Sequence, residues 1–202
     1  MNLLIISLSG DFCLLVKSGT RYWCNGVDLK WVRENPEKGP TVLDLFSRLL
    51  ARLLVFKLPT IALINGHAVG AGMMLSMAFD YRIMSQEKGW IFLPAVNLSI
   101  VLPPSFFSLL KSKIGDGKVF REIVLTGRRY NGAEAKEVGI IDECSTSLEL
   151  ENAVFALAKK VVGKDSEAYY RLKRSMYFDV YNNLMETKVE SDVFDKSHKS
   201  KL

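Results

Sequence analysis

One stretch, residues 59–79, constrains the fold of this chain more than any other. Thr60 to Ile64 is an apolar run that starts after a proline, which predicts a short buried strand. Residues 65–72 are mostly small and include three glycines, which predicts a turn, and Met73 to Phe79 predicts a helix. A buried strand that turns directly into a helix is typical of an α/β domain.

The same alternation continues along the chain. Further strands are predicted at Leu3–Ser9, Cys13–Lys17 and Tyr81–Met84, and further helices at Thr41–Lys57, Pro104–Ile114 and Lys118–Leu125. Thr41 is the expected N-cap of the first of these helices, and Pro59 ends it. Asn131 with Glu134 three residues later resembles a capping box, which predicts another helix that starts after Asn131.

The C-terminal part of the chain has a different pattern. Residues 140–142 are predicted to be extended, and Leu148 to Phe194 is helical in pattern with a break near Gly163. We therefore predict an α/β core at residues 1–147, a helical region at 148–197 and a tail at 198–202.

Composition narrows the class of protein. The chain has 202 residues, of which 49% are hydrophobic, which is enough for one domain. The net charge is +5, but the basic residues form no stripe with aromatics, so no nucleic-acid partner is expected. Cys13, Cys24 and Cys144 lack C-x-x-C spacing and only two histidines are present, so no metal site is expected. No run reaches the roughly 18 apolar residues of a membrane span, and Met1–Leu8 favours a strand over a signal peptide.

The chain ends in Ser200, Lys201 and Leu202. This tripeptide at a free carboxyl terminus is a peroxisomal address that an import receptor reads. The polar run before it, residues 195–199, would keep the tail accessible. The sequence therefore predicts the peroxisome matrix as the location and the import receptor as a partner.

Two glycine-bearing segments, 22–29 and 59–72, are candidates for chemistry. Glycine lets a ligand approach the backbone closely, and the start of a helix offers unpaired N–H groups. Such a turn can hold a phosphate or an oxyanion. Gly70 and Gly72 alone would equally fit close packing of a helix on a strand. A dinucleotide or Walker loop fits poorly, because neither G-x-G-x-x-G nor a following Lys-Ser/Thr is present.

Five segments, in this order, resemble the enoyl-CoA hydratase/isomerase (crotonase) superfamily. They are 25–29 (Asn-Gly-Val-Asp-Leu), 64–72, 79–82 (Phe-Asp-Tyr-Arg), 124–128 (Val-Leu-Thr-Gly-Arg) and 133–142. With the Ser-Lys-Leu end, the chain looks most like the peroxisomal Δ3,Δ2-enoyl-CoA isomerases, particularly the plant-type branch. The resemblance implies a spiral of strand-strand-helix units with a C-terminal helical region. Part of that region would make contacts in a homotrimer or in a mixed oligomer with relatives.

The resemblance also implies roles for residues. The main-chain N–H groups of Val27 and Ala71 would form an oxyanion hole that binds the thioester oxygen of an acyl-CoA while an enolate forms. The residues implied to shape the substrate site are Asn25, Gly26, Asp28, Leu29, Gly70, Gly72, Met74, Ala95 and Asn97. The implied reaction moves a double bond from position 3 to position 2 of an enoyl-CoA in unsaturated fatty-acid β-oxidation. No separate cofactor is implied, because coenzyme A is part of the substrate.

The catalytic glutamate of the family has no counterpart in this sequence. The positions that match it are Met74, Ala95 and Pro103. Loss of a general base typically lowers a rate by about 10²–10⁴-fold. Asn97 and Ser99 are polar but are not bases near neutral pH. His67 could titrate in this range, but its position in the turn indicates a structural role. Three functions stay open: an isomerase-like enzyme, a non-catalytic acyl-CoA-binding or regulatory protein, and a hydratase or thioesterase on the same scaffold.

The N-terminus departs from the family as well. Family members place a helix between their first strand and the strand that enters the first oxyanion segment, but only residues 10–12 are available here. A parallel crossover needs roughly ten residues or more. We therefore expect either an antiparallel hairpin through Gly10-Asp11 or a displaced first strand, in a core that lacks part of what covers the CoA nucleotide in the family.

Overall fold

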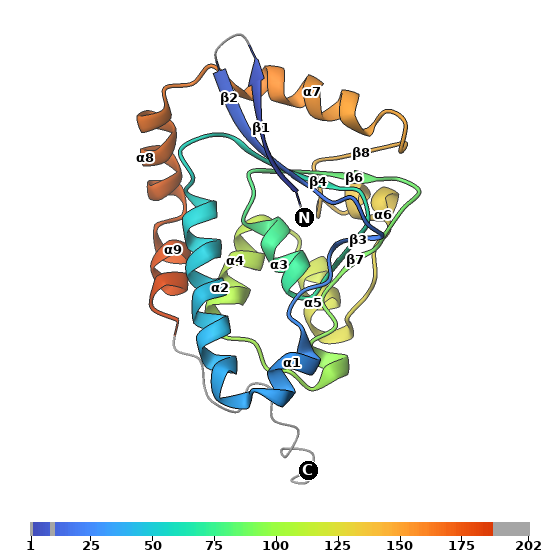
Figure 1. Cartoon of the computed structure of the whole chain (residues 1–202), viewed down its shortest axis with the longest axis vertical. Coiled ribbons are helices and arrows are strands. Elements are labelled where there is room, and N and C mark those ends of the chain that lie inside the picture. The colour runs from blue at the N-terminus through green and yellow to red at the C-terminus, as the bar shows by residue number, and fades with distance from the viewer. Residues whose placement is uncertain (1, 9–10, 188–202) are drawn as a thin grey trace.

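The computed structural model describes residues 2–8 and 11–187, where helices surround two sheets (Figure 1). The larger sheet has the order β1-β2-β4-β6-β8 and the smaller one has the order β3-β5-β7. The strands are β1 (Asn2–Leu8), β2 (Asp11–Lys17), β3 (Tyr22–Cys24), β4 (Thr60–Ile64), β5 (His67–Val69), β6 (Tyr81–Ser85), β7 (Ile91–Phe92) and β8 (Glu143–Ser145). All neighbouring strands are parallel except β1 and β2. The predicted α/β class is confirmed.

Helices cover both faces of the larger sheet (Figure 1). They are α1 (Leu29–Glu34), α2 (Gly39–Leu54), α3 (Ala71–Met77), α4 (Pro104–Lys113), α5 (Gly117–Thr126), α6 (Gly132–Glu137), α7 (Leu150–Val161), α8 (Ser166–Met176) and α9 (Phe178–Met185), with 3-10 turns at Pro36–Lys38 and Val96–Leu98. Among the described helices, none is long and apolar enough to cross a membrane.

The central strands of the larger sheet are buried on both faces, because helices cover both and successive side chains of a strand point to opposite faces. In β2, Cys13 and Leu15 pack in a cluster that contains residues of α7. Val16 packs instead in the main core, which contains residues of α2, α3 and α4. All five residues of β4 are buried, as is usual for a central parallel strand.

The N-terminal strands form the antiparallel hairpin that was one of the two expected arrangements. β1 pairs with β2 in a register that places Leu8 opposite Asp11 and Asn2 opposite Lys17. Asp11, which was expected in the turn with Gly10, belongs to β2, and residues 9–10 lie outside the described part. The short connection explains the direction of the pair, because a parallel crossover needs a longer chain.

The structure corrects the turn predicted at residues 65–72. This segment contains a strand, β5, that pairs in parallel with β3 on one side and with β7 on the other. The Ala68 N–H donates to the Trp90 carbonyl at 2.9 Å, and the His67 N–H donates to the Arg21 carbonyl at 3.0 Å. A strand of three residues between glycines is too short to show a periodic pattern.

Several helix boundaries also differ from prediction. Helix α2 begins at Gly39, and its N-cap is Lys38 rather than Thr41. The extended segment expected at 140–142 lies three residues later, in β8. The region from Leu148 consists of three helices, with the expected break near Gly163 and a second break at Tyr177. Residues beyond 187 of the predicted helical region lie outside the described part. The Asn131–Glu134 capping box is confirmed.

The C-terminal helices dock on the core through a buried ion pair. Lys173 of α8 is 4% exposed, and its Nζ lies 2.8 Å from Oδ1 of Asp80, which precedes β6. The same ammonium group donates to the Phe56 carbonyl at 3.0 Å. Asp80 Oδ2 also accepts from the Thr60 N–H at 2.9 Å and from the Tyr169 hydroxyl at 3.2 Å. These contacts tie α8 to the ends of β4 and α2.

Candidate functional site

The two glycine-bearing segments meet at one edge of the smaller sheet. β3 and β5 are parallel neighbours, so the residues that follow them, 25–27 and 70–71, emerge side by side. Gly26 has a φ of +82°, and a Cβ at this position would lie 2.8 Å from the Val69 carbonyl oxygen and 3.0 Å from the Ala71 nitrogen. Only glycine permits this approach, which brings the main chain of residue 26 against the start of α3.

Gly72 supports the same arrangement from behind. A Cβ on Gly72 would lie 2.1 Å from the carbonyl oxygen of Cys24, at the end of β3. The first turn of α3 therefore packs directly on the β3 backbone, in agreement with the interpretation of this glycine as a packing residue. Gly72 is not among the residues that line the cavity described next.

Two main-chain donors are available at this junction. Ala71 is the first residue of α3, where an N–H has no partner within the helix. Within the described residues, neither the Val27 N–H nor the Ala71 N–H donates a hydrogen bond to another protein group. The loop before α1 is fixed by Asp28, whose Oδ1 accepts the N–H groups of Lys30 and Trp31 at 3.0 Å each. Val27 and Ala71 both line the same cavity.

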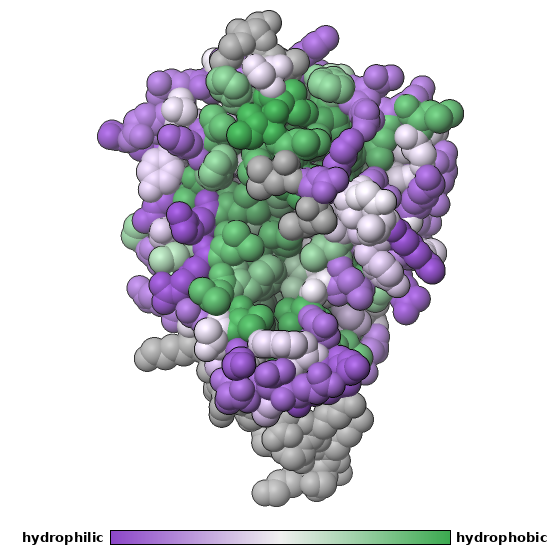
Figure 2. Space-filling view, in the orientation of Figure 1, coloured by the Kyte–Doolittle hydropathy of each residue, from purple (hydrophilic) through white to green (hydrophobic). Residues whose placement is uncertain are grey.

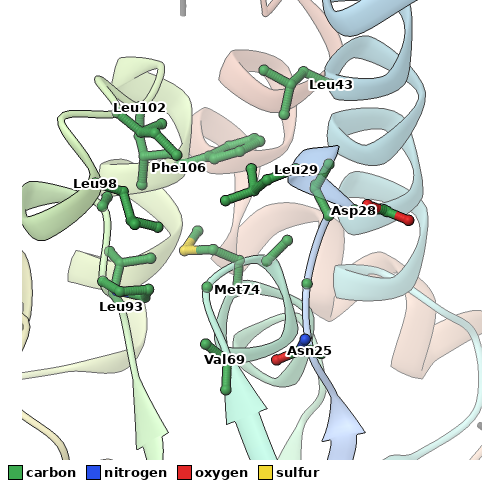
Figure 3. Close-up of a pocket in the computed structure, with 17 residues that line it drawn as sticks. Asn25, Asp28, Leu29, Leu43, Val69, Met74, Leu93, Leu98, Leu102 and Phe106 are labelled. Carbon is green, nitrogen blue, oxygen red and sulfur yellow. The ribbon is translucent and has the colours of Figure 1, made fainter. Parts of the chain in front are cut away.

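This cavity, called the apolar cavity below, has a volume of about 540 Å³ (Figure 3). The main chain at 25–28 and 69–71 forms one end. Its other walls are apolar and come from α1, α2, α3, α4 and the segment after β7. They include Leu29, Leu43, Met74, Leu93, Leu98, Leu102 and Phe106. In Figure 3 the Met74 thioether lies among these side chains, between the glycine turn and the leucines. The volume falls within the range of roughly 300–1,000 Å³ that is usual for small-molecule sites.

Most of the residues proposed from the sequence are brought together here. Those that line the apolar cavity are Asn25, Gly26, Val27, Asp28, Leu29, Gly70, Ala71, Met74 and Ala95. Asn97 does not line it: this exposed residue lies in the 3-10 turn Val96–Leu98, where its amide approaches Gly127. Leu43 and Phe106 also line the cavity but are not predicted, because an apolar helical stripe looks the same whether it covers a core or a cavity.

No carboxylate in the described part of the chain is directed into the apolar cavity. Met74 and Ala95, two of the positions matched to the family glutamates, line it with uncharged side chains, and Pro103 does not line it. Asp28 is the one acidic lining residue, and its carboxylate caps α1 and points away from the cavity in Figure 3. The arrangement can therefore bind a carbonyl oxygen, but it offers no side-chain base beside that oxygen.

His67 lies at the other end of β5, outside the apolar cavity. Its Nδ1 accepts the Trp90 N–H at 3.1 Å, and its ring lies 5.1 Å from that of Tyr22. Burial and the nearby charges of Arg21 and Arg129 lower its pKa, so the imidazole is neutral near pH 7. These contacts agree with the structural role expected for His67.

Two further expectations concern other sites. Ser200, Lys201 and Leu202, the predicted peroxisomal address, lie outside the described residues. Within residues 2–8 and 11–187, no group of three or more His, Cys, Asp or Glu side chains is placed to hold a metal ion.

Known proteins resemble this chain over most of its length. The sequence model of the family described as Enoyl-CoA hydratase/isomerase matches residues 13–201. The protein named enoyl-CoA delta isomerase 2, peroxisomal, from Arabidopsis thaliana is 31% identical over 188 residues, which cover 87% of this chain and 78% of that protein. Enoyl-CoA delta isomerase 3 from the same plant is 28% identical over 172 residues, which cover 81% and 72%.

Solved structures show the same fold. Human mitochondrial delta3-delta2-enoyl-CoA isomerase has a TM-score of 0.76 at 24% identity, and the match covers 84% of this chain and 67% of that one. A probable enoyl-CoA hydratase from Mycobacterium tuberculosis H37Rv has a TM-score of 0.77 at 21% identity, with 85% and 72% covered.

Proposed function

Because this chain belongs to the enoyl-CoA hydratase/isomerase family, we propose that it binds an enoyl-CoA and moves the double bond from position 3 to position 2. One observation carries the proposal: Val27 and Ala71, whose main-chain N–H groups have no partner among the described residues, both line one apolar cavity. Three Arabidopsis relatives named enoyl-CoA delta isomerases support the choice of reaction.

In the proposed reaction the two N–H groups bind the thioester carbonyl oxygen. Negative charge develops on this oxygen when the α-carbon loses a proton, and one such donor typically stabilises the transition state by ~3 kcal/mol. The acyl chain occupies the apolar part of the cavity. Return of a proton to carbon 4 of the dienolate completes the shift, so the reaction gains and loses no atoms. Because Met74 and Ala95 supply no carboxylate, a base from solvent takes the α-proton and returns one to carbon 4. We therefore expect turnover about 10²–10⁴-fold slower than with a carboxylate base in the cavity.

The location proposed for this activity is the peroxisome. Two of the Arabidopsis relatives are named peroxisomal, and the chain ends in Ser200-Lys201-Leu202. The physiological setting we propose is β-oxidation of unsaturated fatty acids, in which 3-enoyl-CoA esters must become 2-enoyl-CoA esters.

A second candidate is binding of acyl-CoA without turnover, alone or in an oligomer with relatives. It is favoured by the uncharged side chains of Met74 and Ala95 and by the use of the Asp28 carboxylate as a helix cap. Hydration is disfavoured, because it normally needs two carboxylates around a water molecule.

The test combines a binding and a rate measurement. Purified protein is titrated with a saturated acyl-CoA, and 3-enoyl-CoA is then supplied while the conjugated 2-enoyl thioester is followed by absorbance. Binding with slow turnover supports the isomerase proposal, and binding with no turnover supports the second candidate. Absence of both would contradict the site itself.

A matched pair of variants locates the missing group. Ala95→Glu places a carboxylate at the wall of the apolar cavity and should raise turnover by about 10²–10⁴-fold. Ala95→Gln has nearly the same shape without a base and should not raise it. An equal effect of both variants would show that the gain does not come from proton transfer.

A further inference from the structure

A second cavity lies at the opposite end of the three-stranded sheet. Parallel strands start at one edge of a sheet and finish at the other, so the segments that precede β3, β5 and β7 also gather together. They enclose a volume of about 520 Å³, lined by residues 18–21, Asn65, His67, Lys88 and Gly89. We call it the basic cavity. It shares no lining residue with the apolar cavity.

The walls of the basic cavity are fixed by main-chain contacts. The Ser18 N–H donates to Asn65 Oδ1 at 3.2 Å, and the Asn65 amide donates back to the Ser18 carbonyl. Gly89 has a φ of +93°, and a Cβ there would lie 2.4 Å from the carbonyl carbon of Gly66. The loops therefore hold their shape without a ligand, which lowers the conformational cost of binding one.

Basic side chains gather at this cavity. Arg21 and Lys88 line it, and Arg129 is close enough to help lower the pKa of His67. In the described part of the chain, no carboxylate oxygen lies within 4.0 Å of the charged nitrogens of these three basic residues. Glu87 is the nearest counter-charge, since hydrogen bonds from Ser147 and also the charge of Lys88 lower the pKa of its carboxyl, but in this part of the chain it forms no ion pair with Lys88 within 4.0 Å. Like charges repel, so an anion bound among them lowers the electrostatic energy.

His67 adds a directed donor to these charges. Its Nδ1 accepts the Trp90 N–H at 3.1 Å, which places the proton of the neutral ring on Nε2. No hydrogen bond from Nε2 to another described residue is present. His67 also lines the basic cavity, so we count its Nε2–H among the donors that a ligand there could use.

We propose that the basic cavity binds a small molecule through its phosphate group. The Arg21 guanidinium matches two phosphate oxygens, and the Lys88 ammonium supplies a point charge. The cavity is larger than a phosphate ion needs and falls within the usual range for small organic ligands, which favours a phosphate ester. The proposal does not depend on the function proposed for the apolar cavity.

The test is calorimetric titration at low salt with ribose 5-phosphate, inorganic phosphate and ribose. Ribose 5-phosphate should bind, ribose should not, and added salt should weaken binding. Binding of inorganic phosphate as tight as that of the ester would identify the free ion as the ligand of the same site. Absence of binding for both phosphates at millimolar concentration, or equal binding of ribose, overturns the proposal.

Variants assign the binding to the cavity. The double variant Arg21→Gln/Lys88→Gln should weaken the binding of ribose 5-phosphate by at least about tenfold, because the loss of one charged hydrogen bond typically lowers affinity by that much. The control Lys159→Gln/Lys160→Gln removes two exposed charges from α7 and should leave binding unchanged. The single variant Lys88→Gln, at an exposed side chain, provides the test if the double variant does not fold. Unchanged binding in a folded Arg21 or Lys88 variant contradicts the assignment.

Discussion

Loss of one partner of the Lys173–Asp80 pair should strongly destabilise the protein. Both side chains are nearly buried, with 5% and 10% of their surfaces exposed. In Lys173→Met, Asp80 keeps its hydrogen bonds from Thr60 and Tyr169. In Asp80→Asn, the Lys173 ammonium loses its only carboxylate partner among the described residues and keeps neutral ones: the Phe56 carbonyl, the amide oxygen of the new side chain and the Tyr169 ring at 5.1 Å. The second variant therefore leaves the less compensated charge.

The magnitude follows from the cost of an unpaired charge in a protein interior. Removal of one partner from a buried pair typically costs ~3–5 kcal/mol. We expect Lys173→Met near the lower end and Asp80→Asn near the upper end of this range. The double variant Lys173→Met/Asp80→Asn should be less destabilised than the sum of the two, because neither charge is left alone.

The measurement is urea unfolding followed by circular dichroism, with all four proteins compared at one pH. Lys30→Met is the control, since Lys30 and Glu34 form an exposed pair at 3.9 Å and its removal should leave the free energy of unfolding almost unchanged. Additive effects of the two buried substitutions, or a loss below about 1 kcal/mol for each, would refute the reasoning.

Three further predictions concern packing and titration. Gly72→Ala should lower both the unfolding midpoint and acyl-CoA affinity, because its Cβ would lie 2.1 Å from the Cys24 carbonyl oxygen, whereas Gly115→Ala meets no atom within 4 Å and should be tolerated. Phe106 is 1% exposed and lines the apolar cavity, so Phe106→Ala should enlarge this cavity and lower the free energy of unfolding by ~3–5 kcal/mol. An unchanged midpoint of urea unfolding would contradict this. Burial lowers the pKa of Lys113 from 10.5 to about 7. Between these pH values the unfolded chain binds a proton at Lys113 that the folded chain lacks. The free energy of unfolding of the wild type, relative to that of Lys113→Met, should therefore rise from about pH 7 to 10.5. A difference that falls or stays constant over this range would argue against a buried Lys113.

The parts that the sequence predicts well are those in which one residue type has one physical use. Gly26 and Gly70 mark the two turns because their φ angles of +82° and +58° suit glycine. The Asn131 capping box is predictable for a similar reason, since both of its partners lie within one helical turn.

Other features depend on contacts between distant segments. β5 forms only because β3 and β7 lie beside it, and three residues carry no periodic signal. Leu43 and Phe106 lie on different helices, and their common cavity exists only after packing. The basic cavity combines Arg21, His67 and Lys88, whose separation in the chain hides their proximity.

The first turn of α3 has a consequence for how such a chain can change. The donors at Val27 and Ala71 belong to the peptide backbone, whereas any acid or base must come from a side chain that lines the cavity, such as those at 74 and 95. Substitutions at 74 or 95 can therefore add or delete a proton acceptor while the two main-chain donors stay in place. Under the proposed function, activity is then gained or lost at one wall residue, as long as the glycines at 26 and 72 keep the backbone geometry.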